Sequence, residues 1–166
     1  IPNNLMSLNF DPNQNCYLFN KKDTVPLVFI HGVGLDHQMW NHQVSYFNEY
    51  STLTYDLLGH GKTPWSKNKL TLKDFSNQLL ELIDHLKIEK INLVGFSLGS
   101  LIALDFSSQF QKKIEKLILI GTTYKRSDQE RSRVLERYNQ AKLNKPISKQ
   151  ALKRWFTDKK KKKNPN

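Results

Sequence analysis

A serine flanked by two closely spaced glycines, in the run Gly-Phe-Ser-Leu-Gly, makes Ser97 a candidate catalytic nucleophile. The apolar residues 91–94 before it predict a buried strand, and a helix is expected to begin at Leu98. A sharp turn between strand and helix would lift the serine hydroxyl out of the sheet. Gly95 and Gly99 fit this geometry, because a Cβ at either position would collide with the neighbouring strand or helix. The motif therefore predicts nucleophilic attack on an acyl group by the serine.

A second motif, His-Gly-Val-Gly, follows the predicted strand at residues 26–30. A glycine-containing loop beside a nucleophile can point a main-chain N–H at the negatively charged oxygen of an acyl intermediate. The expected oxyanion donors are the backbone N–H groups of Val33 and Leu98. The residues expected to shape and anchor this loop are His31, Gly32 and Gly34. His31 is tempting as a general base, but we expect it to anchor the loop by hydrogen bonding.

A third motif, Asp-Leu-Leu-Gly-His-Gly at residues 56–61, follows the predicted strand at residues 51–55. It could resemble a phosphate-binding loop, but the Gly-Lys-Ser or Gly-Lys-Thr ending of such loops is absent. We therefore expect a structural turn that carries the chain over the sheet, with His60 as a turn residue. No metal ion or cofactor is expected.

Strands and helices are expected to alternate, which predicts an α/β fold with a mostly parallel sheet flanked by helices. The predicted strands are residues 26–30, 51–55, 91–94 and 114–120, with two weaker strands at 5–9 and 16–20 joined by a turn at 11–13. The predicted helices are residues 39–49, 72–86, 98–110, 129–143 and 148–156. The helix at 72–86 is amphipathic and has Thr71 as its expected N-cap, whereas the helix at 98–110 should be deeply buried.

Charge divides the chain near Tyr124. Residues 1–124 hold eleven lysines and eleven acidic residues, while residues 125–166 hold fifteen Lys or Arg against four acids and so account for the net charge of +11. We expect a solvated helical face and a lysine-rich end, because no nucleic-acid motif accompanies the charge. An anionic-membrane or RNA surface is the weaker alternative. The absence of a long apolar run argues against a membrane span, and the single cysteine, Cys16, weakly favours a cytoplasmic location.

Together, the three motifs and their order resemble the α/β-hydrolase superfamily, and within it the 3-oxoadipate enol-lactonases and related small esterases. The resemblance covers residues 15–124 well and extends into Arg-Trp-Phe-Thr at residues 154–157, which is similar to the opening of the helical cap. It implies a serine hydrolase of small ester or lactone substrates that forms an acyl-enzyme. It also implies that residues 1–124 are the N-terminal part of the hydrolase core and that 125–166 begin the cap, so the chain lacks the last strands.

The superfamily orders its catalytic triad as serine, acid and histidine along the chain. The five histidines here are His31, His37, His42, His60 and His85, and all precede Ser97. Of the later acids, Asp105 should point away from the site, and Asp128 is a minor candidate for the triad acid. We therefore expect a nearly inactive fragment of a longer hydrolase. The alternative is a pseudoenzyme that binds a ligand without turnover. A fragment of this kind would leave residues 114–120 as an apolar sheet edge prone to aggregation.

Overall fold

The computed structural model describes residues 7–65 and 69–142 of the 166-residue chain. It divides the chain into two compact units, Ile1–Thr123 and Tyr124–Asn166. This boundary lies beside the compositional break at Tyr124. The predicted helix at 148–156, the cap-like run at 154–157 and the lysine-rich stretch at 159–163 fall outside the described residues.

Six strands of the first unit form one mixed sheet in the order β1-β2-β4-β3-β5-β6. Their bounds are β1 Asn9–Phe10, β2 Cys16–Asn20, β3 Leu27–Ile30, β4 Thr52–Tyr55, β5 Ile91–Phe96 and β6 Ile114–Ile120. The strands from β4 to β6 in this order run parallel, whereas β2 pairs antiparallel with both β1 and β4. The predicted mostly parallel α/β sheet is confirmed. Of the two strands predicted from weaker patterns, the one at 16–20 has its predicted bounds as β2, whereas the one at 5–9 is observed as β1, which has two residues.

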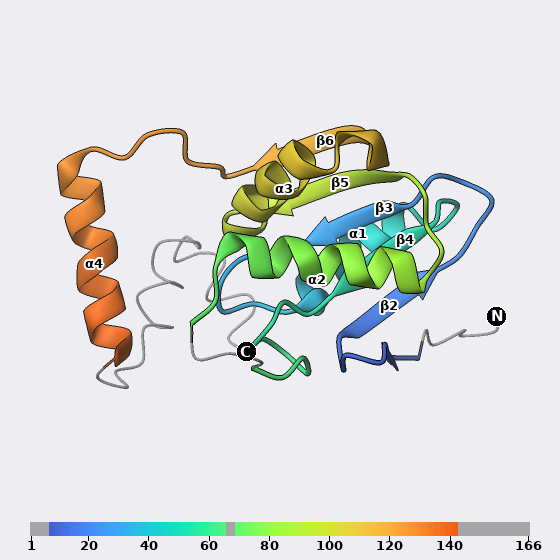
Figure 1. Cartoon of the computed structure of the whole chain (residues 1–166), viewed down its shortest axis with the longest axis horizontal. Helices are drawn as coiled ribbons and strands as arrows, with labels where there is room; N and C mark the ends of the chain where they lie inside the picture. Colours follow the sequence, from blue (N-terminus) through green and yellow to red (C-terminus); the bar gives the residue numbers. More distant parts are fainter. Residues whose placement is uncertain (1–6, 66–68, 143–166) are drawn as a thin grey trace, which may run out of the picture. The chain divides into compact units, whose positions relative to one another are not determined.

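Alternate residues of the central strands face two separate apolar layers. Val28 and Ile30 of β3 pack into the main core together with α2 (Leu72–His85) and α3 (Leu98–Gln109), which lie side by side over one face of the sheet (Figure 1). Phe29 points to the other face, where its ring centroid lies 5.1 Å from that of Trp40. Because strands covered on both faces read as continuous apolar runs, the unbroken hydrophobic pattern of β3 follows directly from this layering.

The helix α2 begins where its sequence predicts. The Thr71 side chain accepts a hydrogen bond from the N–H of Asp74, and the Asp74 carboxylate accepts one from the N–H of Thr71. This reciprocal capping satisfies two donors that the first helical turn leaves unpaired. Its buried side chains include Phe75, Leu79 and Ile83, so the predicted amphipathic face is the one that packs on the core.

Two predicted helices differ in detail from those observed. The expected helix at 39–49 is a 3-10 turn, η1 (His37–Trp40), followed by a short α1 (Asn41–Tyr46) behind the sheet (Figure 1). The helix α3 is less buried than predicted, since Leu104 is 41% exposed. The remaining described helical segments are η2 (Gln111–Lys113), between α3 and β6, and α4 (Asp128–Lys142), in the second unit.

The strand β6 is an edge of the sheet and is more exposed than a buried parallel strand should be. It pairs with β5 alone among the described strands, and Leu117, Ile118 and Ile120 are each at least one-third exposed. Among the described strands, β6 therefore holds the edge position that its sequence predicts. The aggregation expected of an apolar edge stays a prediction.

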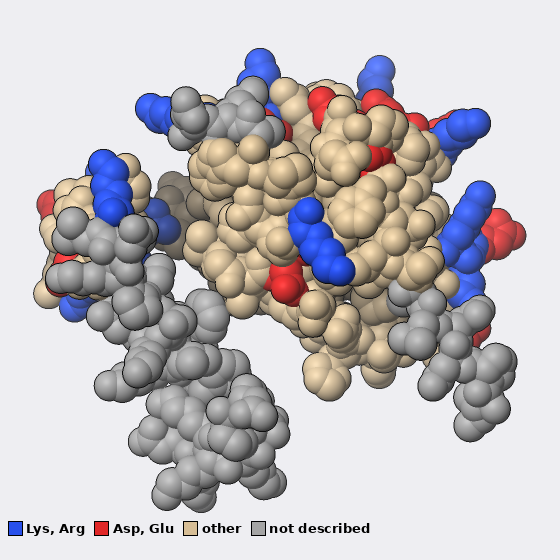
Figure 2. All heavy atoms as spheres, turned by 90° about the horizontal axis from the view of Figure 1, so that it is seen from below, with Lys and Arg blue, Asp and Glu red and all other residues tan. Residues whose placement is uncertain are grey.

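Charged side chains are scattered over the first unit. Figure 2 shows Lys and Arg projecting singly around the visible face, with Asp and Glu among them and without one continuous basic patch. No helix in the described part of the chain is long and apolar enough to cross a membrane.

Candidate active site

Ser97 lies in the turn between β5 and α3, with a backbone conformation that is rare for a residue with a side chain. Its φ is 53° and its ψ is −113°, and its N–H donates to the carbonyl of Ile120 at 2.9 Å. Such a conformation costs on the order of 1–3 kcal/mol and persists only where the surrounding structure imposes it. Its side chain makes no capping hydrogen bond to α3, so the hydroxyl is not used to build the helix.

Close backbone packing explains both glycines of the motif. A Cβ on Gly95 would collide with the carbonyl oxygen of Gly99, and a Cβ on Gly99 would collide with the carbonyl oxygen of Ile30 and lie 2.7 Å from that of His31. Backbone atoms on both sides of the turn cannot move away without displacing a strand. The two glycines thus let β3, β5 and α3 meet beneath the serine.

The loop predicted to hold the oxyanion lies beside Ser97. A Cβ built on Gly32 would lie 3.4 Å from the Cβ of Ser97. Among the described residues, none accepts a hydrogen bond from the N–H of Val33 or of Leu98. The Val33 side chain is 62% exposed, so it does not bury the loop. The two main-chain donors expected to face an oxyanion are therefore both unpaired.

His31 is fully buried at the start of this loop and bonded at both ring nitrogens. Its Nε2 lies 3.0 Å from the N–H of Leu57, and its Nδ1 lies 2.8 Å from the carbonyl of Gly32. A backbone N–H can only donate and a carbonyl can only accept, so the proton must be on Nδ1. Burial lowers the pKa of His31 below its ordinary value, against the opposing effect of the Gly32 carbonyl. With both nitrogens occupied, this ring is not available as a base.

The lowered pKa of His31 predicts a loss of stability in mild acid. Between pH 6.5 and its folded pKa the unfolded chain binds a proton that the folded chain excludes, so stability falls as the pH falls through this window. The unfolding free energy of wild type should therefore be lower at pH 5.5 than at pH 7.5. In His31→Gln this decrease should be smaller than in wild type by up to about 1 kcal/mol. Urea unfolding at both pH values measures it, and equal drops in the two proteins would contradict the prediction.

No described acid or histidine forms a hydrogen bond with the Ser97 side chain. Asp105 accepts instead from the hydroxyl of Ser76 on α2 and from the amide of Gln109 on α3, both at 2.6 Å, which agrees with the expectation that it points away from the site. Asp128 begins α4 in the second unit. Within the first unit, the described residues thus bring a serine beside two main-chain N–H groups that are expected to bind an oxyanion, and no described acid or histidine of that unit bonds the serine hydroxyl.

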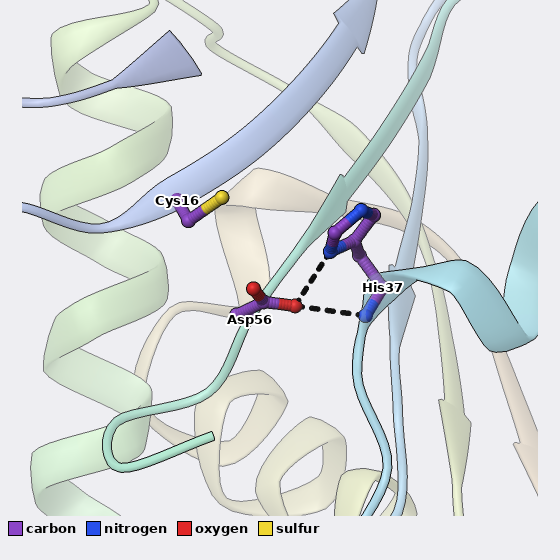
Figure 3. A group of neighbouring side chains, drawn as sticks. All are labelled: Cys16, His37 and Asp56. Atoms are coloured by element: carbon purple, nitrogen blue, oxygen red, sulfur yellow. Dashed lines mark hydrogen bonds and ion pairs between the residues drawn. The ribbon is translucent and has the colours of Figure 1, made fainter. Parts of the chain in front are cut away.

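Sequence analysis missed a buried polar cluster behind the oxyanion loop, formed by Cys16, His37 and Asp56 (Figure 3). One carboxylate oxygen of Asp56 accepts from the His37 ring at 2.7 Å and from its main-chain N–H at 2.8 Å. The other oxygen accepts from the N–H of Lys62 at 2.8 Å. Burial alone would raise the pKa of Asp56, but these hydrogen bonds outweigh it and lower that pKa. The one sequence signal was an aspartate placed directly after a fully buried strand.

The cluster has the residue types of a metal site but not the spacing. Its three potential ligand atoms lie within 4.8 Å of one another. Bonds of about 2.0 Å at tetrahedral angles would separate a nitrogen and an oxygen ligand by about 3.3 Å. The 2.7 Å between His37 Nδ1 and Asp56 Oδ1 is instead a charge-assisted hydrogen-bond length. We therefore interpret the cluster as hydrogen-bonded.

Cys16 should be unreactive in the folded protein. Its side chain is fully buried, and burial together with the neighbouring Asp56 charge raises the pKa of its thiol to about 11. Because the thiolate is the reactive form, we expect no labelling by a disulfide reagent at pH 8 in native buffer and one thiol per chain in denaturant. Rapid native labelling would show that β2 opens or that the thiol is exposed.

The third motif forms the structural turn that its sequence predicts. Gly59 and Gly61 have φ values of +71° and +52°, and the His60 ring contacts the carbonyl of Leu58 at 3.0 Å within the same turn. A Cβ on Gly61 would collide with the Asp56 carboxylate. The turn therefore folds back onto the Asp56 carboxylate, which also accepts a hydrogen bond from the N–H of Lys62.

The same three motifs and topology connect the chain to known proteins. The sequence model for the alpha/beta hydrolase fold matches residues 25–149. The chain belongs to the α/β-hydrolase family. It is 30% identical over 151 residues to an (E)-2-((N-methylformamido)methylene)succinate hydrolase of Acinetobacter baylyi, and 26% identical over 144 residues to 3-oxoadipate enol-lactonase 2 of the same organism. The resemblance to enol-lactonases is confirmed.

The two alignments cover 90% and 86% of this α/β-hydrolase chain but only 57% and 54% of the two relatives. The chain thus spans little more than half the length of the curated relatives it matches. A solved hydrolase of Pseudomonas aeruginosa superimposes with a TM-score of 0.78 at 20% identity, over 99% of this chain and 64% of that one. At this identity the likeness shows the fold alone.

Proposed function

We propose that this chain carries the nucleophile half of a serine hydrolase that acts on small ester or lactone substrates through an acyl-enzyme. The observation that carries the proposal is the strained turn at Ser97, which has a φ of 53° and leaves the hydroxyl free of any capping role. Ser97 attacks the substrate carbonyl, and the N–H groups of Val33 and Leu98 stabilise the resulting oxyanion. Relatives whose names denote an enol-lactonase and a succinate-derivative hydrolase support a small, soluble acyl substrate.

In this proposal, a base outside the described residues takes the proton from Ser97, because His31 is hydrogen-bonded at both ring nitrogens and no described histidine bonds the Ser97 hydroxyl. A serine hydroxyl is a weak nucleophile without such a base. We assign no triad acid or histidine in this chain. In this proposal, the Val33 and Leu98 N–H groups bind the oxyanion, and turnover requires the base as well.

The Ser97 hydroxyl has no hydrogen-bond partner among the described residues, which also supports the alternative of a pseudoenzyme that binds the same class of ligand without turnover. Expression of the whole open reading frame that contains this sequence separates the two. We expect hydrolysis of p-nitrophenyl acetate and of a small enol-lactone, and loss of both in Ser97→Ala with unchanged folding. Equal hydrolysis by wild type and Ser97→Ala would exclude the serine mechanism, and binding without hydrolysis would favour the pseudoenzyme.

A further inference from the structure

The oxyanion loop, residues 31–37, is held at both of its ends by two consecutive residues that follow β4. The N–H of Leu57 donates to the ring of His31 at the start of the loop. The carboxylate of Asp56 accepts from both the ring and the main-chain N–H of His37 at its end. Figure 3 shows the His37 ring and main chain converging on the same carboxylate oxygen. One short segment therefore fixes the distance between the two ends of the loop.

The middle of the loop has few ties of its own. Among the described residues, neither Val33 nor Gly34 forms a hydrogen bond, and both are exposed. The turn at this point is closed by the N–H of Leu35 donating to the carbonyl of Gly32 at a long 3.3 Å. The Gly32 carbonyl belongs to the same peptide group as the Val33 N–H, and it accepts from the His31 ring at 2.8 Å. The direction of the Val33 N–H is thus set by the His31 end of the loop and by the turn that leads to the His37 end.

The anchor at the His37 end is a buried charge with all of its partners in place. Asp56 is fully buried and His37 is 5% exposed. Removing one partner of a buried carboxylate leaves the charge with fewer hydrogen bonds and no water to replace the lost one, which is more costly than losing a surface contact. The main-chain N–H of Asp56 also donates to the carbonyl of Cys16 in β2 at 2.9 Å. This end of the loop is consequently tied to β2 and β4 together.

We infer that His37 and Asp56 are positioning residues that hold the oxyanion loop so that the Val33 N–H faces the site of attack by Ser97. The inference rests on the proposed function and adds two residues to it. Oxyanion donors act at hydrogen-bond distance, and a displacement of about 1 Å is enough to weaken them severely. His37 does not touch the substrate in this arrangement and acts through the loop alone.

A boronic acid probe tests the inference in the 166-residue chain without requiring a base for turnover. The Ser97 oxygen adds to the trigonal boron of phenylboronic acid, its proton goes to the solvent, and the tetrahedral boronate formed carries the negative charge. One boronate oxygen then occupies the oxyanion position. Titration of a ¹⁵N-labelled sample, followed at the Val33 and Leu98 amides, gives the dissociation constant, and Ser97→Ala controls for addition elsewhere.

Three variants separate positioning from general stability. His37→Ala should weaken the adduct about 10-fold and lower the order parameter of the Val33 amide from about 0.85 to below 0.6. His37→Asn should restore both values to near wild type, because the asparagine amide nitrogen occupies the place of Nδ1 and can donate to Asp56. His42→Ala, which removes an exposed histidine from α1, should change neither.

The outcomes distinguish this inference from the proposed function. Equal adduct affinity and equal loop order in wild type and His37→Ala would overturn the inference. No adduct in wild type, with loop order still lost in His37→Ala and regained in His37→Asn, would contradict the proposed function while supporting the anchoring of the loop. Weakening in His37→Ala that tracks only a lower unfolding midpoint, without rescue by asparagine, would also overturn it.

Discussion

Replacing Gly99 with alanine should destabilise the fold by about 3 kcal/mol or more, among the largest effects of any single methyl group in this chain. The added Cβ would collide with the Ile30 carbonyl oxygen and lie 2.8 Å from its carbon. Both contacts are to the backbone of a central strand, so relief requires β3 and α3 to move apart. The gain in helix propensity from glycine to alanine, about 1 kcal/mol, works against this loss and is smaller than it.

Gly34→Ala is the matched control for Gly99→Ala. Gly34 has a φ of +72° with no atom within 4 Å of a built Cβ, so its replacement adds backbone strain of about 1–2 kcal/mol without a collision. Urea unfolding followed by circular dichroism measures both variants against wild type. A Gly99→Ala protein as stable as Gly34→Ala would show that the strand and helix separate easily, and the close packing described here would be wrong.

Elements with local signals were predicted well from the sequence. The reciprocal hydrogen bonds of Thr71 and Asp74 involve neighbours in the chain, so α2 begins at its predicted residue. The strands β3, β5 and β6 were found because unbroken apolar runs and the turns that end them are also local. The geometry of the Ser97 turn follows in the same way from two glycines at fixed spacing.

The remaining features depend on contacts that sequence patterns do not contain. The segment expected as a helix at 39–49 begins earlier, as the 3-10 turn η1, because the Asp36 side chain accepts from the N–H of Gln38 and the Asp56 carboxylate accepts from the N–H of His37. The polar cluster arises because β2 pairs antiparallel with β4, and the N–H of Asp56 donates to the carbonyl of Cys16, a residue forty positions earlier. No local pattern joins these two residues.

Ser97 in this 166-residue polypeptide should react with a fluorophosphonate little faster than an ordinary serine. All five histidines precede it in the chain, the His31 ring is fully hydrogen-bonded, and no described base bonds its side chain. Removing the histidine of a serine triad costs about 10⁶-fold in turnover, and the oxyanion donors retain only about 10³- to 10⁴-fold over water. Labelling at micromolar probe should therefore stay at the level of Ser97→Ala over minutes, while a complete serine hydrolase run in parallel is labelled fully.

Complete labelling of Ser97 within minutes, located by peptide mapping, would contradict this prediction and require an activating base within the chain. Comparison with the boronate titration makes the result specific. Addition of the serine oxygen to boron is an equilibrium in which the proton can leave to solvent, whereas displacement of fluoride from phosphorus within minutes requires that the proton be removed as the bond forms. A chain that binds the boronate but resists the fluorophosphonate would therefore possess the turn and the oxyanion donors and lack only the base. We expect this result because, among the described residues, the N–H groups of Val33 and Leu98 and the hydroxyl of Ser97 have no hydrogen-bond partner.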